Sequence, residues 1–233
     1  MIVLSVDSSS NSATVALVAN KSVIGEINIT DKKQHSEVLM TMIDSALKLC
    51  GLTINQIDGY VVSKGPGSFT GLRIGMATIK GLSLGSNKPT VSVSNLDGLA
   101  YNVITHKGLI CPIMDALRGN VYTSFYENSN GELKRLTDYM ILSIDELITR
   151  CIEDNRSVIF VGDGTEKHKS TIESALKNSV FAPPHLNYAR ASTLGLIGIN
   201  LLEKGTCDEV DASPFYLRKS QAEREYDKKM GLE

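Results

Sequence analysis

Short apolar runs alternate with glycine-rich and polar turns along the chain, a pattern typical of strands interspersed with helices. In the first part, three apolar runs of strand length precede a longer stretch with helical spacing, which Ser36 is expected to cap and Gly51 to end. A fourth run and a second helical stretch follow. The expected elements are strands at 2–7, 13–19, 23–29 and 57–63 and helices at 36–50 and 71–85. This order predicts the α/β fold class.

The same order recurs in the second half, which indicates a duplication. Asp115 ends an apolar run 108 residues after Asp7 does, and Ser143, with Glu146 as its capping-box partner, begins a helix 107 residues after Ser36. The elements expected here are strands at 109–115, 120–126, 133–142 and 157–161 and helices from 143, at 165–176 and at 191–204. Residue identity between the halves is low, so one mixed sheet with a chance likeness of order is the alternative.

The duplication predicts two domains, at residues 1–104 and 105–217. Residues 218–233 form a tail that mixes both charges and contains few apolar residues. We expect such a tail to be frayed or to be ordered by a partner.

The most distinctive local pattern is the stretch 65–75, GPGSFTGLRIG, between the fourth strand and the second helix. Its glycines allow positive φ or the close approach of another backbone. A plain strand-to-helix turn and a phosphate-binding turn both fit this spacing. The stretch is not a P-loop, because no Gly-Lys-Ser/Thr ends it. It also lacks the last glycine of the dinucleotide motif, since Thr70 stands at that place.

This stretch, together with Lys80-Gly81-Leu82, closely resembles the signature of the bacterial TsaB family, which takes part in making threonylcarbamoyladenosine in tRNA. Further matching segments follow in the family's order along nearly the full length. They are 7–9 (DSS), 35–37 (HSE), 115–122 (DALRGNVY) and 214–218 (PFYLR). The resemblance implies the fold of the actin, hexokinase and Hsp70 superfamily, which consists of two duplicated βββαβα domains.

Composition is ordinary for a globular chain of 233 residues, with 42% apolar and 21% charged residues. The net charge of −2 provides no basic field for nucleic acid, so another subunit is expected to supply most contacts to tRNA phosphates. No apolar run approaches the ~18 residues of a membrane span, and no signal-peptide pattern begins the chain. Cys50, Cys111, Cys151 and Cys207 are far apart, and we expect them to be buried, reduced thiols in a cytoplasmic protein.

Two acids that end strands are the candidate nucleotide site. In the superfamily, nucleotide phosphates lie between the first hairpins of the two halves, where Asp7, Ser8, Ser9 and Asp115 stand here. The first turn has no glycine or lysine to hold phosphate, so the site is expected to be vestigial, and the acids could simply cap turns. No tightly bound cofactor is expected, and ATP or ADP would bind the isolated chain weakly. Residues 162–164, where the superfamily holds adenosine, also fit a plain turn.

Metal catalysis is not expected. The catalytic relative TsaD has a His-x3-His pair on its first long helix, where two imidazoles can share an ion, but here His35 is followed by Leu39. No Ser-His-Asp or Cys-His pairing occurs at a recognised spacing. Tyr122, Phe125 and Tyr126 lie on one expected strand without alternating basic residues, which is typical of sheet packing rather than nucleic-acid binding.

The helix at 37–50 is the main indication of a protein partner. Its polar residues from Thr41 onward lie on one narrow stripe, so its apolar arc is wider than one sheet requires. Packing within the chain is one explanation. The resemblance favours another, because TsaB members use two N-terminal helices to pair with TsaD or, when TsaD is absent, with themselves. The expected partner-binding residues are Leu39, Met42, Ile43, Ala46, Gly71, Arg73, Gly75, Met76 and Ile79, with Arg73 at the rim.

The resemblance implies a non-catalytic subunit that binds and activates TsaD, which transfers threonylcarbamoyl to the adenosine next to the anticodon. The ATPase subunit TsaE is implied as a further partner, and tRNA would be contacted only through the complex. The alternative is an ATP-dependent small-molecule kinase of the same superfamily that uses Asp7 and Asp115. A peptidase acting on the partner is a third class, but no nucleophile can be named for it. The sequence gives neither the affinity for TsaD nor the role of the homodimer in the cell.

Overall fold

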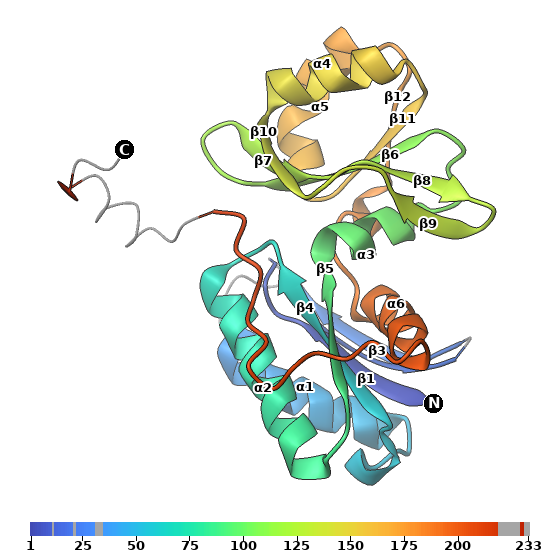
Figure 1. Cartoon of the computed structure of the whole chain (residues 1–233), viewed down its shortest axis with the longest axis vertical. Helices are drawn as coiled ribbons and strands as arrows, with labels where there is room; N and C mark the ends of the chain where they lie inside the picture. Colours follow the sequence, from blue (N-terminus) through green and yellow to red (C-terminus); the bar gives the residue numbers. More distant parts are fainter. Residues whose placement is uncertain (11, 21, 31–34, 219–228, 231–233) are drawn as a thin grey trace.

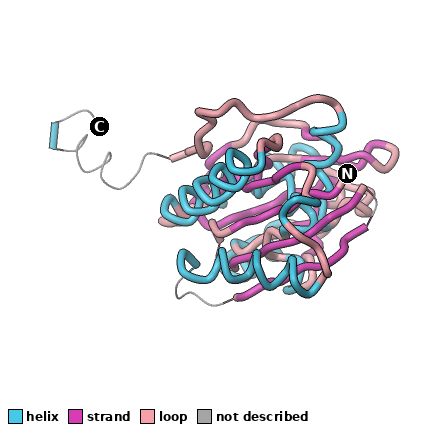
Figure 2. Tube along the Cα trace, turned by 90° about the horizontal axis from the view of Figure 1, so that it is seen from below, coloured by secondary structure: helices cyan, strands magenta, loops and turns pink. Residues whose placement is uncertain are grey.

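The structure is a computed structural model, and it describes residues 1–10, 12–20, 22–30, 35–218 and 229–230. Two sheets follow one another along the long axis of the molecule, and each is flanked by helices (Figure 1). Seen from below, the strands run between helices on either side (Figure 2). The predicted α/β class is confirmed, and the alternative of one mixed sheet is wrong, because the strands form two sheets.

The first sheet has five strands in the order β3-β2-β1-β4-β5. β1 pairs antiparallel with β2 and parallel with β4, so the hairpin strands lie on one side and the crossover strands on the other. Helices α1 and α2 cover one face of this sheet. The elements of this half are β1 (Ile2–Asp7), β2 (Ala13–Ala19), β3 (Ser22–Ile29), α1 (His35–Leu49), a 3₁₀ turn (Ile54–Gln56), β4 (Gly59–Gly65), α2 (Phe69–Ser86), β5 (Thr90–Ser94) and α3 (Asn95–Asn102).

The second sheet repeats this order as β10-β7-β6-β11-β12, with an added β8–β9 hairpin that pairs with β6. β6 is antiparallel to β7 and parallel to β11, as β1 is to β2 and β4, which confirms the duplication. The elements are β6 (Leu109–Asp115), β7 (Asn120–Thr123), β8 (Tyr126–Ser129), β9 (Glu132–Arg135), β10 (Met140–Ser143), α4 (Ile144–Asp154), β11 (Val158–Val161), α5 (Gly164–Ala175), β12 (Ser179–Phe181), a 3₁₀ turn (Pro184–Leu186) and α6 (Ala191–Glu203).

Local side-chain bonds explain two boundaries in this half. The capping box that begins α4 is present, with Ser143 N donating to Glu146 Oε2 over 2.8 Å and Glu146 N donating to Ser143 Oγ over 3.3 Å. The expectation of a single strand at 120–126 is wrong. The strand ends with β7 at Thr123, because Phe125 N donates to the hydroxyl of Thr137 instead of continuing the ladder.

Helix α6 (Ala191–Glu203) lies in the range expected for the second domain, 105–217, but packs with the first half. It packs on the face of the first sheet opposite α1 and α2, where Leu194 and Ile199 join the apolar residues of β1, β2, β4 and β5. The segment after α6 then runs back along the first half, with Phe215 N donating to Lys64 O over 2.8 Å. The physical reason is that the second apolar face of the first sheet also needs a cover. Most of the expected tail, 218–233, lies outside the described residues.

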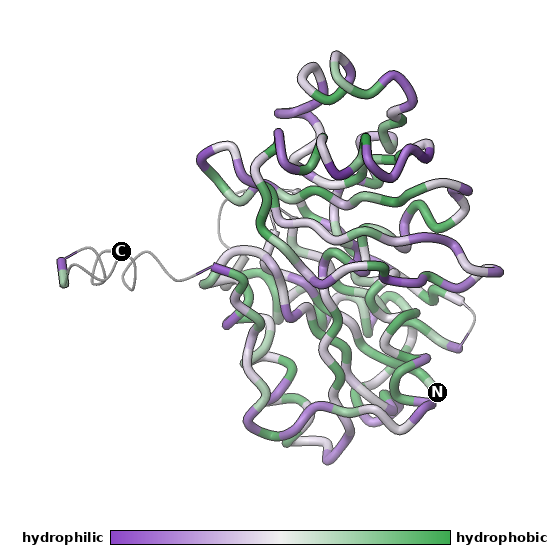
Figure 3. The backbone as a smooth tube through the Cα atoms, turned by 45° about the horizontal axis from the view of Figure 1, so that its top comes forward, coloured by the Kyte–Doolittle hydropathy of each residue, from purple (hydrophilic) through white to green (hydrophobic). Residues whose placement is uncertain are grey.

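Many of the apolar residues lie along the strands, as the green segments of Figure 3 show. Cys50, Cys111, Cys151 and Cys207 are free thiols, and the expected burial holds for Cys111 and Cys151 but not for Cys207, which is exposed. Among the described residues, no helix combines the length and the apolar character that a membrane span requires.

Candidate functional site

The end of β1 places Asp7 inside the molecule, where only 1% of the residue is exposed. Its Oδ1 accepts hydrogen bonds from Ser9 N over 2.9 Å and from Ser9 Oγ over 2.6 Å. Burial raises the pKa of the Asp7 carboxyl, and these two bonds only partly oppose that rise. Its Oδ2 is buried and has no partner among the described residues. Asp7 therefore caps the first turn, and its part in a vestigial nucleotide site stays a prediction.

Asn95 connects this turn to two other strand ends. Its Nδ2 donates to Ser9 Oγ over 2.7 Å and to Pro66 O over 3.0 Å, and its Oδ1 accepts from Ser63 Oγ over 2.7 Å. Asn95 is not among the site residues expected from the sequence, because β5 and α3, which meet at this residue, are not among the expected elements. The available signal was the β-branched run that ends in Ser94, whose side chain caps α3.

The glycine loop lies directly on the first turn. Ser68 N donates to Ser9 O over 2.7 Å, and Ser8 Oγ donates to Gly71 O over 2.9 Å. A Cβ at Gly71 would lie 2.1 Å from the carbonyl oxygen of Ser8, which no side chain can accept. The Ser68 side chain also accepts from Gly71 N and so caps α2. The loop is thus a strand-to-helix turn whose glycines allow the chain's own backbone to cover Ser8 and Ser9.

The corresponding acid of the second half, Asp115, is partly exposed and held differently. Lys167 Nζ lies 3.0 Å from its Oδ1 and 3.2 Å from its Oδ2, and Leu117 N donates to Oδ1 over 3.0 Å. Asp115 N in turn donates to Asp163 Oδ1 over 3.1 Å. Burial raises the pKa of the Asp163 carboxyl. The turn at 162–164 stands out in the sequence, but the contacts of Asp163 and Lys167 with Asp115 do not, because each lies about fifty positions from it.

The turn at 162–164 adjoins a cavity of about 550 Å³ at the start of α5. Part of its polar lining is already paired, since Asn187 accepts from Gly162 N and donates to Thr165 Oγ1 over 3.0 Å. Lys169 Nζ lies 5.4 Å from the ring centroid of Phe181 on the same wall. This cavity has room for a small molecule, and weak ATP or ADP binding stays a prediction.

The described residues contain no group of three or more His, Cys, Asp or Glu side chains placed to hold a metal ion. The side chain of His35 lies outside the described part of the chain. The expected absence of a bound metal therefore stays a prediction.

Six of the nine residues expected to bind a partner are core residues of the first half. Met42, for example, is 3% exposed and packs onto the sheet through the same cluster as Leu4 and Val62. This assignment of side chains to a partner is wrong, because the wide apolar arc of α1 lies between its own sheet and α2. The six buried side chains are those of Leu39, Met42, Ile43, Ala46, Met76 and Ile79.

The other three expected partner residues are also engaged within the chain. Gly71 and Gly75 lie against Ser8, and a Cβ at Gly75 would come 3.0 Å from Ser8 Oγ. Arg73 is exposed, but its Nε donates to the hydroxyl of Tyr216 over 3.0 Å. Tyr216 itself stacks on Phe69, with ring centroids 4.5 Å apart. The 214–218 motif thus fastens the returning chain to the first turn of α2.

The outward faces of α1 and α2 carry a different set of residues. Met40 is 52% exposed, two positions from buried Met42. Along α2, Ala77, Gly81 and Gly85 are exposed at a spacing of four, so they form one stripe of small residues. A Cβ at Gly81 or Gly85 would meet nothing within 4 Å. We call Met40 together with this stripe the outer face.

Comparison with known proteins places the chain among tRNA-modification proteins. The model of the family described as "TsaD: tRNA N6-adenosine threonylcarbamoyltransferase" matches residues 22–226. The chain is 35% identical over 227 residues to the "tRNA threonylcarbamoyladenosine biosynthesis protein TsaB" of Bacillus subtilis (strain 168), and the match covers 97% of this chain and 98% of that protein.

Solved structures show the fold. "YeaZ from Pseudomonas aeruginosa" superimposes with a TM-score of 0.76 at 22% identity, covering 93% of this chain and 99% of that one. The ROK hexokinase from Thermus thermophilus superimposes with a TM-score of 0.51 at 10% identity, covering 88% and 100%. The chain therefore has the fold of the actin and hexokinase superfamily, as expected.

Proposed function

Because the chain belongs to the TsaB family of tRNA threonylcarbamoyladenosine biosynthesis proteins, we propose that it is a non-catalytic subunit that binds and activates TsaD. It contributes to the modification of the adenosine next to the anticodon without carrying the transfer step itself. TsaE is the further partner, tRNA is contacted only through the complex, and the site of action is the cytoplasm. Alone, the chain pairs with a second copy of itself.

The observation that carries this proposal is the filled first turn. In a phosphotransferase of this fold, the turn after the first strand must stay open to phosphate. Here the chain's own backbone covers Ser8 and Ser9, through the 2.7 Å bond from Ser68 N and the bond from Ser8 Oγ to Gly71 O. The Asp7 carboxyl below is buried, and burial raises its pKa, which disfavours the charged form that a divalent cation needs.

The second acid also argues for a structural role. Asp115 forms an ion pair with Lys167 and accepts from Leu117 N, so its carboxylate already has a cation and a donor. A kinase that used both acids would have to break these bonds and lift the glycine loop. The geometry therefore favours the scaffold over the kinase alternative.

The outer face is the surface that we assign to the partner. Glycine inside a helix costs about 1 kcal/mol relative to alanine, and neither Gly81 nor Gly85 is required by packing among the described residues. Small residues at a spacing of four allow a second helix to approach closely. Exposed Met40 supplies an adaptable apolar contact on α1. An interface of this kind activates TsaD only if it binds the active conformation of TsaD more tightly than the inactive one.

Reconstitution tests the proposal. The chain, TsaD and TsaE from one organism are purified and assayed for threonylcarbamoyl transfer to tRNA, singly and in combination. We expect transfer only when TsaD is present and a large increase when this chain is added to it. Asp7→Asn and Asp115→Asn should leave that increase intact, because neither carboxylate carries chemistry. Transfer by this chain alone, or loss of the increase in a folded Asp7→Asn protein, would sink the proposal.

A further inference from the structure

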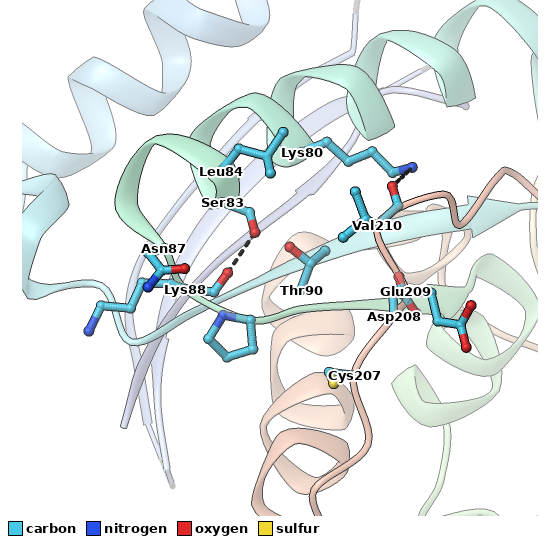
Figure 4. Close-up of a pocket in the computed structure, with 11 residues that line it drawn as sticks. Lys80, Ser83, Leu84, Asn87, Lys88, Thr90, Cys207, Asp208, Glu209 and Val210 are labelled. Atoms are coloured by element: carbon cyan, nitrogen blue, oxygen red, sulfur yellow. Dashed lines mark hydrogen bonds between the residues drawn. The ribbon is translucent and has the colours of Figure 1, made fainter.

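A pocket of about 310 Å³ lies at the C-terminal end of α2, between that helix, the start of β5 and the segment that follows α6 (Figure 4). Leu84, Pro89 and Val210 form apolar walls, and the side chains of Leu84 and Val210 are largely exposed. This volume is at the lower end of the range of small-molecule pockets. The pocket therefore has room for a short aliphatic group.

Two buried oxygens in the lining of this pocket are unsatisfied. Thr90 is 9% exposed, and its hydroxyl points into the space between Ser83 and Val210 (Figure 4). Among the described residues, neither Thr90 Oγ1 nor Asp208 Oδ2 has a hydrogen-bond partner. Leaving a buried polar atom unpaired is unfavourable, so an occupant that pairs both atoms recovers this free energy.

Two hydrogen bonds within the chain fix the position of Asp208. Its backbone N donates to Thr90 O over 2.7 Å, and its Oδ1 accepts from Ser92 Oγ over 3.2 Å. The direction of Oδ2 is therefore fixed before anything binds. Because an ionised carboxylate only accepts hydrogen bonds, the occupant must be a donor.

The two lysines that line the pocket do not donate to Thr90 Oγ1 or Asp208 Oδ2. Lys80 lies along the rim, and its Nζ donates to Val210 O over 2.8 Å. The Lys88 side chain points away from Thr90 (Figure 4). The last carbonyls of α2, which ends at Ser86 and is capped by Asn87, place the negative end of the helix dipole beside the pocket. The helix dipole favours a positively charged donor, and because neither lysine supplies one, that donor comes from outside the chain.

We propose that this pocket binds a primary ammonium group on a short aliphatic chain. The ammonium donates to Asp208 Oδ2 and Thr90 Oγ1, and the methylenes lie against Leu84, Pro89 and Val210. This chemistry has two sources, a free aliphatic amine and a lysine side chain of another protein.

The test uses the full chain, ¹⁵N-labelled, and n-butylammonium as the probe. We expect saturable shifts at the backbone amides of Thr90 and Asp208, and binding at least about tenfold weaker for n-butanol, which lacks the charge. Thr90→Val and Asp208→Asn should each weaken binding of n-butylammonium by about tenfold. Asp211→Asn, which removes a nearby exposed carboxylate that does not line the pocket, is the matched control and should bind normally. Thermal melting confirms that each variant is folded.

The two sources separate in the same assay. Tighter binding of putrescine than of capped lysine assigns a free amine, and the reverse order assigns a protein side chain. The proposal is overturned if none of the amines shifts these amides, in which case water satisfies the two oxygens. Equal binding by wild type and by folded Thr90→Val and Asp208→Asn proteins would overturn it as well.

Discussion

The inner and outer faces of helices α1 and α2 use the same residue types for opposite purposes. On the inner face, Gly71 is required because any side chain would meet Ser8. On the outer face, Gly81 lies in open space and weakens the helix that contains it. Met42 is buried in the core and Met40 is half exposed, although only one residue separates them along the helix. A glycine or methionine therefore indicates an interface only where packing within the chain does not explain why that residue stands there.

Met42→Glu should lower the stability of the chain more than any other change, because it disrupts the packing of the inner face. The change removes a buried apolar side chain and places a carboxyl in the core, so we expect a loss of about 5 kcal/mol in the free energy of unfolding. Met40→Glu is the matched control and should change that free energy by less than about 0.5 kcal/mol. Chemical denaturation measures both. Similar stabilities for the two variants would contradict the assignment of the faces.

Gly71→Ala tests the contact between the glycine loop and the first turn. Its Cβ would fall 2.1 Å from the carbonyl oxygen of Ser8, so the loop or the turn must move. We expect a loss of about 3 kcal/mol in the free energy of unfolding, at the upper end for an added methyl group. Gly81→Ala adds the same group in open space, and denaturation should show it to be neutral or slightly stabilising. Equal effects would mean that the loop does not press on the turn.

Asp7→Asn tests whether the first acid is a buried cap. Because burial raises the folded pKa of Asp7 above its unfolded value, the folded state holds the proton more tightly. The stability from that proton is complete below about pH 4, the ordinary Asp range, and is lost as the pH rises through the folded pKa. Denaturation from pH 4 to pH 8 should therefore show wild type losing stability relative to Asp7→Asn. Curves that stay parallel over this range would show that the carboxyl is not buried as described.

Apolar runs and caps were enough to predict most of the first sheet and its two covering helices. Periodicity does not show which side of α1 faces the core. Its apolar arc, which contains Leu39, Met42 and Ile43, is so wide that either side of the arc could face the sheet or a partner. Asn95 reaches Ser9 across 86 residues, and no local pattern indicates that bond. The place of α6 on the first sheet is likewise set by tertiary packing, which the order of elements does not reveal.

The role of the outer face, on which the account of partner binding depends, is tested most directly by Gly81→Leu. Size-exclusion chromatography with TsaD is combined with thermal melting of the isolated chain, and Ala175→Leu, at an exposed position of α5, is the control. Gly81→Leu should melt at or slightly above the wild-type temperature, because leucine suits a helix better than glycine and meets no neighbour. It should nevertheless lose pairing with TsaD by at least about a hundredfold, since a bulky side chain separates the two helices. Normal pairing by a folded Gly81→Leu protein would contradict the account.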